Sequence, residues 1–235
     1  TFCHAVYPGQ LFAQNDSILT GTMKMLDATL QEGMVMGTGW QIDGIWNYFA
    51  SFYGHASLWL GEKEKAVAII GSYASYLAIP GSEVANKAKI PMMANTATNP
   101  LVTLNKEYVF RACFIDPLQG TALANFATDE LKAKTAMIIL DRANDYSVGL
   151  ANYFKEAFEK ATSSTIEELK YNSGDQDFSA QLTVVKSKNP DILFIPAGNY
   201  GDAGLIAKQA RDLGITSTFM GGDTWDTPEF AQIGG

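Results

Sequence analysis

The sequence has few of the residues on which metal sites and catalytic triads most often depend. Its 235 residues include only two histidines, His4 and His55, and two cysteines, Cys3 and Cys113. The cysteines lie far apart, and no Cys-x-x-Cys or Cys/His pattern has metal-ligand spacing. One disulfide could join them, but two separate buried thiols are the simpler interpretation. Two histidines and two distant cysteines favour neither a histidine-dependent catalytic triad nor a metal site, and we predict neither.

Signatures of nucleotide binding and of hydrolysis are missing as well. Neither G-x-G-x-x-G nor G-x-x-x-x-G-K-[ST] occurs, and G-x-S-x-G is absent too. The chain is acidic, with a formal net charge of −8, and no Lys/Arg cluster is longer than the GEKEK run at 61–65. An acidic chain without a basic patch argues against nucleic-acid and anionic-membrane partners. We therefore predict a protein that is not an enzyme and uses no cofactor.

The sequence also lacks membrane and export signals. No apolar run is long enough to span a bilayer. The chain does not open with a basic stretch followed by an apolar one. If the protein is exported, we expect this chain to belong to the mature form.

Five short apolar runs predict buried parallel strands. Each is rich in Ile, Val, Met or Phe and is bounded by polar residues or by Gly and Pro. The runs are residues 66–71, 90–94, 135–140, 191–196 and 217–222. Helical patterns lie between them: one begins at Asp116-Pro117, one ends at Asn189-Pro190, and one is stopped by Gly214. This alternation predicts an α/β fold with a doubly wound sheet.

The first 65 residues carry weaker patterns. Met25, Leu26, Thr29 and Leu30 predict a helix that ends at Gly33. Residues 40–60 hold seven aromatic side chains, most of them at helical spacing. We interpret this stripe as an amphipathic helix packed on a sheet, with an aromatic ligand box as the alternative.

Polar residues follow each predicted strand, where ligands of open α/β sheets bind. Hydroxyl groups and the N–H groups of helix starts suit a carboxylate. Asp223 suits an ammonium group, and Tyr146 and Tyr200 could line an apolar slot while donating hydrogen bonds. A zwitterion with an apolar tail would use all three kinds of group. The alternative is that these residues only form turns and caps.

Longer strings in the same loops resemble the branched-chain amino acid binding proteins of ABC importers, within the type I periplasmic-binding-protein family. The strings are AIIGSYAS (68–75), TATNPLVT (96–103), FRACFIDPLQG (110–120), DYSVGLA (145–151), SGDQDFSAQL (173–182), NPDILFIPAGNYGDAGLIAKQAR (189–211) and FMGGDTWDTPEF (219–230). The resemblance runs from about residue 66 to residue 235, whereas residues 1–65 depart from the family pattern.

The resemblance implies a two-lobed type I fold, each lobe a doubly wound, mostly parallel sheet flanked by helices. The lobes would be residues 1–115 and 116–235, with the family's C-terminal return segments lying outside this chain. The residues that the resemblance places at the ligand are Tyr73, Ser75, Thr96, Ala97, Thr98, Tyr146, Asn199, Tyr200 and Asp223. Ser75 and residues 96–98 would hold the carboxylate and part of the ammonium group, with Tyr73 at the rim. Asp223 would pair with the ammonium group from the second lobe. Phe12 and Gln14 are weaker candidates.

The function so implied is that of a periplasmic or extracellular solute receptor. It would bind leucine, isoleucine, valine or a similar amino acid by lobe closure, as a monomer, and serve the membrane permease of an ABC transporter. Two alternatives stay open. One is a receptor of the same fold for short amides, urea or aromatic acids, and the other is the ligand-sensing domain of a signalling receptor.

Overall fold

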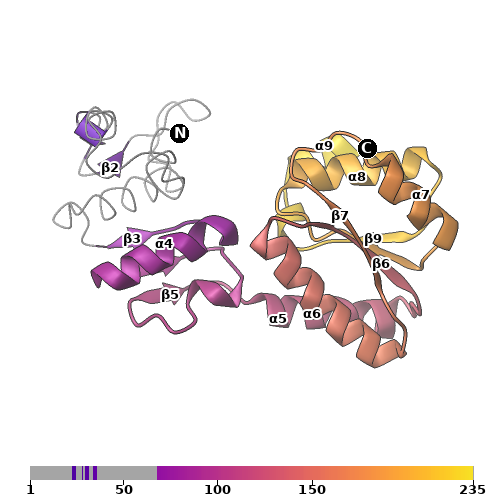
Figure 1. The fold of residues 1–235 in the computed structure, drawn as a ribbon, viewed down its shortest axis with the longest axis horizontal. Helices are drawn as coiled ribbons and strands as arrows, with labels where there is room; N and C mark the ends of the chain where they lie inside the picture. The colour runs from indigo at the N-terminus through magenta and orange to yellow at the C-terminus, as the bar shows by residue number, and fades with distance from the viewer. Residues whose placement is uncertain (1–22, 25–27, 29, 32–33, 36–67, 235) are drawn as a thin grey trace. The chain divides into compact units, whose positions relative to one another are not determined.

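The computed structural model describes residues 23–24, 28, 30–31, 34–35 and 68–234, and Figure 1 shows their fold. The chain forms two compact units, Thr1–Cys113 and Phe114–Gly235. The division lies two residues before the boundary expected from the sequence, and the assignment of 1–115 and 116–235 as lobes stays a prediction. Among the described residues, every helix is too short or too polar to cross a bilayer.

The described strands form one antiparallel pair and two parallel sheets. The strands are β1 (Leu30–Gln31), β2 (Met34–Val35), β3 (Ile69–Ile70), β4 (Met92–Ala94), β5 (Val109–Arg111), β6 (Ala136–Asp141), β7 (Glu167–Tyr171), β8 (Ile192–Phe194) and β9 (Thr218–Met220). In the first unit β1 pairs with β2, and the parallel sheet has the order β3-β4-β5. In the second unit the parallel sheet has the order β7-β6-β8-β9.

Helices alternate with these strands, as the sequence predicts. They are α4 (Ser75–Ala88), α5 (Asp116–Asn125), α6 (Asp145–Thr162), α7 (Ser179–Lys188), α8 (Tyr200–Asp212) and α9 (Pro228–Gly234). Shorter turns are η2 (Pro100–Val102), η3 (Phe126–Glu130) and η4 (Asp223–Trp225). Asn189 ends α7 in the left-handed conformation, with φ at 47°, and Gly214 follows α8 with φ at 76°. Both helix ends are therefore where the sequence places them.

The second unit is a sheet with helices on both faces, and Figure 1 shows α5 and α6 on one side and α7 and α8 on the other. All six residues of β6 are buried. Ile138 packs in a core with Phe154 and Phe158 of α6, whereas Ile139 packs on the opposite face with Leu182 of α7. Since the chain passes from β7 on one side of β6 to β8 on the other, the sheet is doubly wound, and the predicted fold class is confirmed.

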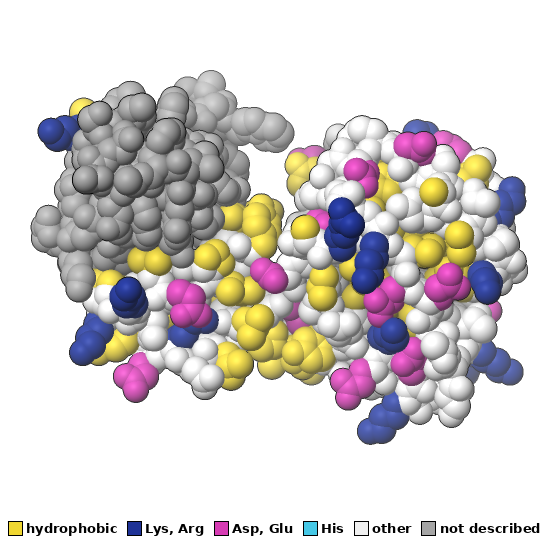
Figure 2. Space-filling model, in the orientation of Figure 1, with side chains coloured by type: hydrophobic (Ala, Val, Ile, Leu, Met, Phe, Trp, Pro, Cys, Tyr) yellow, Lys and Arg dark blue, Asp and Glu magenta, His cyan; other side chains and the backbone are white. Residues whose placement is uncertain are grey.

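The sheet of the first unit has one covered and one exposed face. Its inner residues, such as Ile69 and Met92, pack with Ala78 and Ala85 of α4. On the other face, Ile70, Met93 and Phe110 lie side by side on neighbouring strands. These residues are 64, 39 and 52% exposed, respectively. Figure 2 shows such hydrophobic side chains at the surface of this unit.

Several sequence expectations need correction. Leu30, expected in a helix, lies in β1, which pairs antiparallel with β2. The Asp-Pro pair predicts Asp116 as the cap residue of a helix, but α5 begins at Asp116 and Ile115 occupies the cap position. Cys113 is half-buried rather than buried. The predicted helix over 40–60, both histidines, Cys3, Phe12 and Gln14 lie outside the described residues.

Candidate functional site

The carboxyl edge of the second sheet brings three of the predicted loops together. Because β6, β8 and β9 are parallel neighbours, the segments that follow them leave the sheet on the same edge. These segments carry Tyr146, the Asn199–Tyr200 pair and Asp223. The chain reverses its winding between β6 and β8, which is the point where open α/β sheets bind ligands.

Tyr146 and Asp223 form the tightest polar contact at this edge. The Tyr146 hydroxyl donates to Asp223 Oδ1 at 2.6 Å, although 77 residues separate them. The ring is only 5% exposed, whereas Asp223 lies at the surface. Burial first, and the nearby Asp223 carboxylate second, raise the pKa of Tyr146. The phenol therefore stays protonated and keeps its donor directed at the acid.

A second donor reaches the same carboxylate oxygen. Gln119 of α5 donates its Nε2 hydrogen to Asp223 Oδ1 at 3.1 Å. With two donors on Oδ1, the other oxygen of Asp223 remains the natural acceptor for a cation. We did not identify Gln119 from the sequence, because a single glutamine in a helix carries no distinguishing pattern.

The turn η4 that carries Asp223 is anchored on both sides. Thr224 Oγ1 donates to the Ala197 carbonyl at 2.8 Å, and Trp225 stacks on Phe230 of α9 with ring centroids 4.4 Å apart. Gly222 allows the close approach of Tyr146, since a Cβ there would lie 2.1 Å from the tyrosine oxygen. The acid therefore sits on a fixed turn rather than a free loop.

The Asn199–Tyr200 pair begins α8, and the asparagine caps the helix. Asn199 Oδ1 accepts the Asp202 N–H at 2.8 Å, and its Nδ2 donates to Ser173 Oγ at 3.4 Å. Asp202 is buried, and burial is the largest cause that raises the pKa of its carboxyl group. Tyr200 is half-buried. The capping role uses the oxygen of Asn199 and leaves Tyr200 as the better candidate for ligand contact.

The corresponding edge of the first unit gathers hydroxyl groups. Ser75 opens α4, after β3, and its Oγ accepts the Asn99 N–H at 3.1 Å, so its own hydroxyl proton is left to donate elsewhere. Thr98 follows β4, is 2% exposed, and its Oγ1 has no hydrogen-bond partner among the residues that the structure describes. A helix start with hydroxyls beside it is a favourable place for a carboxylate.

The remaining predicted residues of this unit frame that edge. Thr96 Oγ1 donates to the Tyr73 carbonyl at 2.9 Å and so joins the two loops. Tyr73 is 45% exposed and Ala97 is 1% exposed. The structure thus brings together Tyr73, Ser75 and Thr96 to Thr98 in the first unit. Whether any of these residues contacts a ligand stays a prediction.

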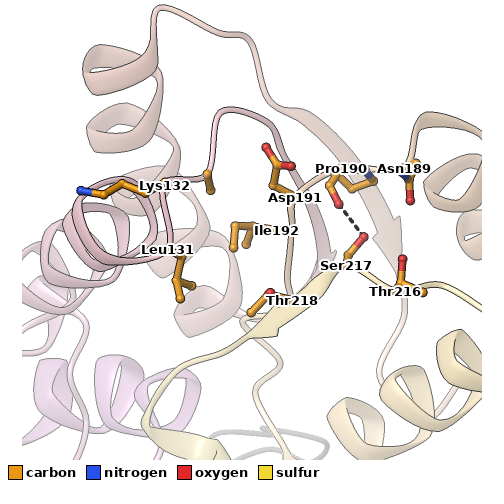
Figure 3. A pocket seen from close by; sticks show the side chains of 10 residues that line it. Leu131, Lys132, Asn189, Pro190, Asp191, Ile192, Thr216, Ser217 and Thr218 are labelled. Carbon is orange, nitrogen blue, oxygen red and sulfur yellow. Dashed lines mark hydrogen bonds between the residues drawn. The ribbon is translucent and has the colours of Figure 1, made fainter.

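A hollow of about 290 Å³ lies at the opposite, amino edge of the second sheet. Figure 3 shows Asp191, Ser217 and their neighbours around it. Asp191 Oδ2 accepts the Lys134 and Thr135 N–H groups at 2.8 and 2.9 Å, and Ser217 donates to the Pro190 carbonyl at 2.6 Å. These polar groups are used in joining strands, so we do not assign a ligand to this hollow.

Charge and metal-ligating residues add no further site. On the face seen in Figure 2, acidic and basic side chains are interspersed over the described part of the second unit. Within the described ranges, no group of three or more His, Cys, Asp or Glu residues is arranged to hold a metal ion.

Comparison with known proteins gives consistent matches. The profile of a family described as periplasmic binding protein matches residues 59–235. The Leu/Ile/Val-binding protein homolog 3 of Brucella melitensis is 33% identical over 171 residues, which are 71% of this chain and 45% of that protein. The chain thus spans about half the length of the curated relatives it matches.

Two solved structures share the fold and a clear sequence similarity. The leucine-binding protein LivK from Thermotoga maritima is 42% identical, with a TM-score of 0.74 over 79% of this chain and 53% of that one. The branched-chain amino acid transporter substrate-binding protein LivJ from Streptococcus pneumoniae, in complex with isoleucine, is 27% identical, with a TM-score of 0.69 over 92% and 60%.

Proposed function

The chain belongs to the periplasmic binding protein family, and on that premise we propose that its protein is a receptor for a branched-chain or other aliphatic amino acid. It binds the amino acid without transforming it. It works outside the cytoplasm and serves the membrane permease of an ABC importer. The names of the relatives support this proposal, since they bind leucine, isoleucine or valine.

The observation that carries the proposal is the exposed carboxylate of Asp223 with two donors on one oxygen. Tyr146 and Gln119 donate to Oδ1, at 2.6 and 3.1 Å, which leaves Oδ2 to accept from a ligand. An ammonium group is that partner, because it donates hydrogen bonds and balances the charge. An amide or urea ligand would bring no positive charge for this acid.

The first unit would supply the groups for the other end of the same ligand. Ser75 keeps a hydroxyl proton to donate, Thr98 has a hydroxyl without a partner among the described residues, and α4 directs its amino end to this edge. A carboxylate would satisfy all three. Lobe closure would then bring an acid and a set of donors to one zwitterion.

Isothermal titration of the full-length protein with leucine, isoleucine, valine and alanine tests the proposal. We expect saturable binding of at least one of them, and no binding of N-acetylleucine, which lacks the ammonium charge. Binding of N-acetylleucine as tightly as leucine would reject the role of Asp223. No heat with any amino acid would reject the receptor function itself.

A further inference from the structure

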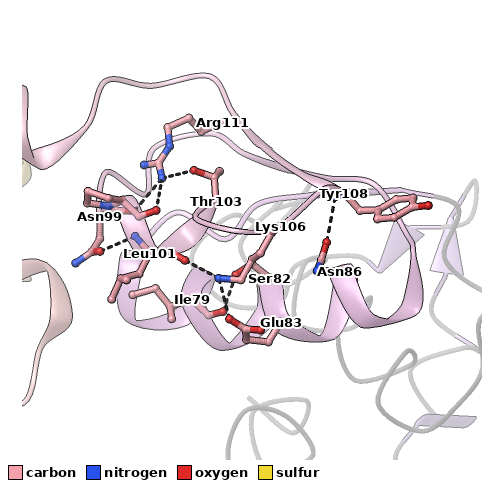
Figure 4. A network of polar contacts seen from close by, with 11 residues as sticks. Ile79, Ser82, Glu83, Asn86, Asn99, Leu101, Thr103, Lys106, Tyr108 and Arg111 are labelled. Atoms are coloured by element: carbon pink, nitrogen blue, oxygen red, sulfur yellow. Dashed lines mark hydrogen bonds and ion pairs between the residues drawn. The ribbon is translucent and has the colours of Figure 1, made fainter.

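The side chain of Arg111, at the end of β5, makes several hydrogen bonds to the loop after β4 (Figure 4). Its Nη1 donates to the Ala97 carbonyl at 2.9 Å, and its Nη2 donates to the Asn99 carbonyl and to Thr103 Oγ1, both at 2.9 Å. A longer contact of 3.3 Å reaches the Pro100 carbonyl. One guanidinium group thus gathers the backbone of a whole turn.

Arginine is suited to this task in a way that lysine is not. Its guanidinium group is planar and carries five N–H donors in a fixed fork, whereas a lysine has one nitrogen on a flexible stem. Arg111 pairs with Ala94 across β5 and β4, which places it beside the start of the loop. Within residues 68–234, the acceptors that the structure gives to Arg111 are uncharged oxygens.

These bonds orient the groups that face the strand edge. The peptide between Ala97 and Thr98 is planar, and in a trans peptide the carbonyl and the N–H point in opposite directions. With the Ala97 carbonyl directed at Arg111, the Thr98 N–H is directed away from it. Ser75 holds the other side of the loop by accepting the Asn99 N–H at 3.1 Å. The loop is therefore tied at two points, with Thr98 between them.

We propose that Arg111 is a positioning residue for the ligand's carboxylate. It does not contact the ligand, but it fixes the loop whose hydroxyl and N–H groups do. The inference rests on the proposed function, because it takes Ser75 and Thr98 as the groups that bind a carboxylate.

The test compares leucine with leucinamide, which keeps the ammonium group and lacks the carboxylate charge. In Arg111→Lys, which keeps the positive charge but loses the fork, we expect leucine affinity to fall about tenfold or more, the effect of one or two hydrogen bonds. Leucinamide affinity should change by less than about threefold, because leucinamide has no carboxylate for the loop to bind. The dissociation constant for leucinamide divided by that for leucine should therefore fall. Arg111→Met should lower this ratio further.

Arg211→Lys is the matched control. Arg211 also gathers carbonyls, donating from Nη1 to Ile215 and Ser217 at 2.6 and 3.0 Å, but it does so near the amino end of β9. Its substitution should lower thermal stability and leave the ratio unchanged. An unchanged ratio in Arg111→Lys, with both ligands weakened equally, would overturn this inference and leave the proposed function intact. Failure of the unsubstituted protein to bind leucine would reject both.

Discussion

The hydroxyl of Tyr146 lies 2.6 Å from Asp223 Oδ1, so a buried phenol of α6 holds an exposed acid of η4. The two residues are brought together by the parallel arrangement of β6, β8 and β9. Because the pKa of Tyr146 is raised by burial and by Asp223, the phenol remains a donor at every physiological pH. This pair is the most defined part of the candidate site, and several predictions rest on it.

Asp223→Asn should weaken leucine binding by about 2–5 kcal/mol, because the ligand's ammonium group would lose its charged partner. Titration calorimetry measures the change. Asp226→Asn is the control, since Asp226 is an exposed acid three residues later and should be neutral in the same experiment. Unchanged affinity in Asp223→Asn would favour the alternative of an amide or urea receptor.

Tyr146→Phe should reduce leucine affinity by about 1.5–3 kcal/mol, the effect of removing a hydrogen bond to a charged group. Tyr153→Phe, on the same helix and half-buried, should leave the affinity unchanged. Since the raised pKa keeps Tyr146 protonated, the difference between the variant and the unsubstituted protein should be constant from pH 6 to 8 or thereabouts. A difference that vanishes within that range would contradict the assigned hydrogen bond.

Gly222→Ala should destabilise the protein and weaken ligand binding, because the added Cβ would lie 2.1 Å from Tyr146 Oη and 2.7 Å from Leu150 Cδ2. Combining it with Tyr146→Phe removes the oxygen in the closer contact. The loss of unfolding free energy in the double variant should therefore be smaller than the sum of the losses in the two single variants. Thermal or urea unfolding of the four proteins measures this coupling, and strict additivity would show that the contact is relieved in another way.

Asp191→Asn should lower the free energy of unfolding at pH 7 by about 1–2 kcal/mol, since Asp191 accepts two N–H groups and the Thr135 hydroxyl. These hydrogen bonds, led by the one from Lys134 N–H, lower the pKa of Asp191 below its ordinary 3.8. The stabilisation is therefore present above that value and is lost as the pH falls through the lower, folded-state pKa.

Urea unfolding at pH 7 and at pH 3 measures this effect. The two proteins should differ less at the lower pH. Asp212→Asn serves as the control, because Asp212 pairs with the exposed Lys208, at 3.6 Å, and such surface pairs contribute little. An equal loss at both pH values would contradict the charge-assisted role of Asp191.

The sequence predicted the buried parts of the fold better than its edges. The strand at 135–140 was clear because every residue of β6 is buried and apolar up to Asp141, and the buried strand at 191–196 was found in the same way. The apolar run at 217–222 also predicted β9, although that strand lies at the sheet edge and is only partly buried. Strand β7 was missed. It lies at the sheet edge, and its sequence EELKY is mostly charged, so it lacks the apolar run that marks a central strand.

In the candidate site, too, the sequence predicted some residues and missed others. Loops that follow apolar strands could be placed at the sheet edge from sequence, and the structure places Ser75, Thr98 and Asp223 in the segments that follow such strands. Their contact with a ligand stays a prediction. Supporting residues such as Gln119 and Arg111 could not be found, because their partners are 104 residues away or are backbone carbonyls. Only the folded chain brings such groups together.

A crystal structure of the full-length protein with leucine tests the central claim most directly. The account predicts that the ammonium group of leucine lies within hydrogen-bond distance of Asp223 Oδ2 and that its carboxylate meets Ser75 and Thr98. Leucine bound at another place, or bound with its carboxylate toward Asp223, would contradict it.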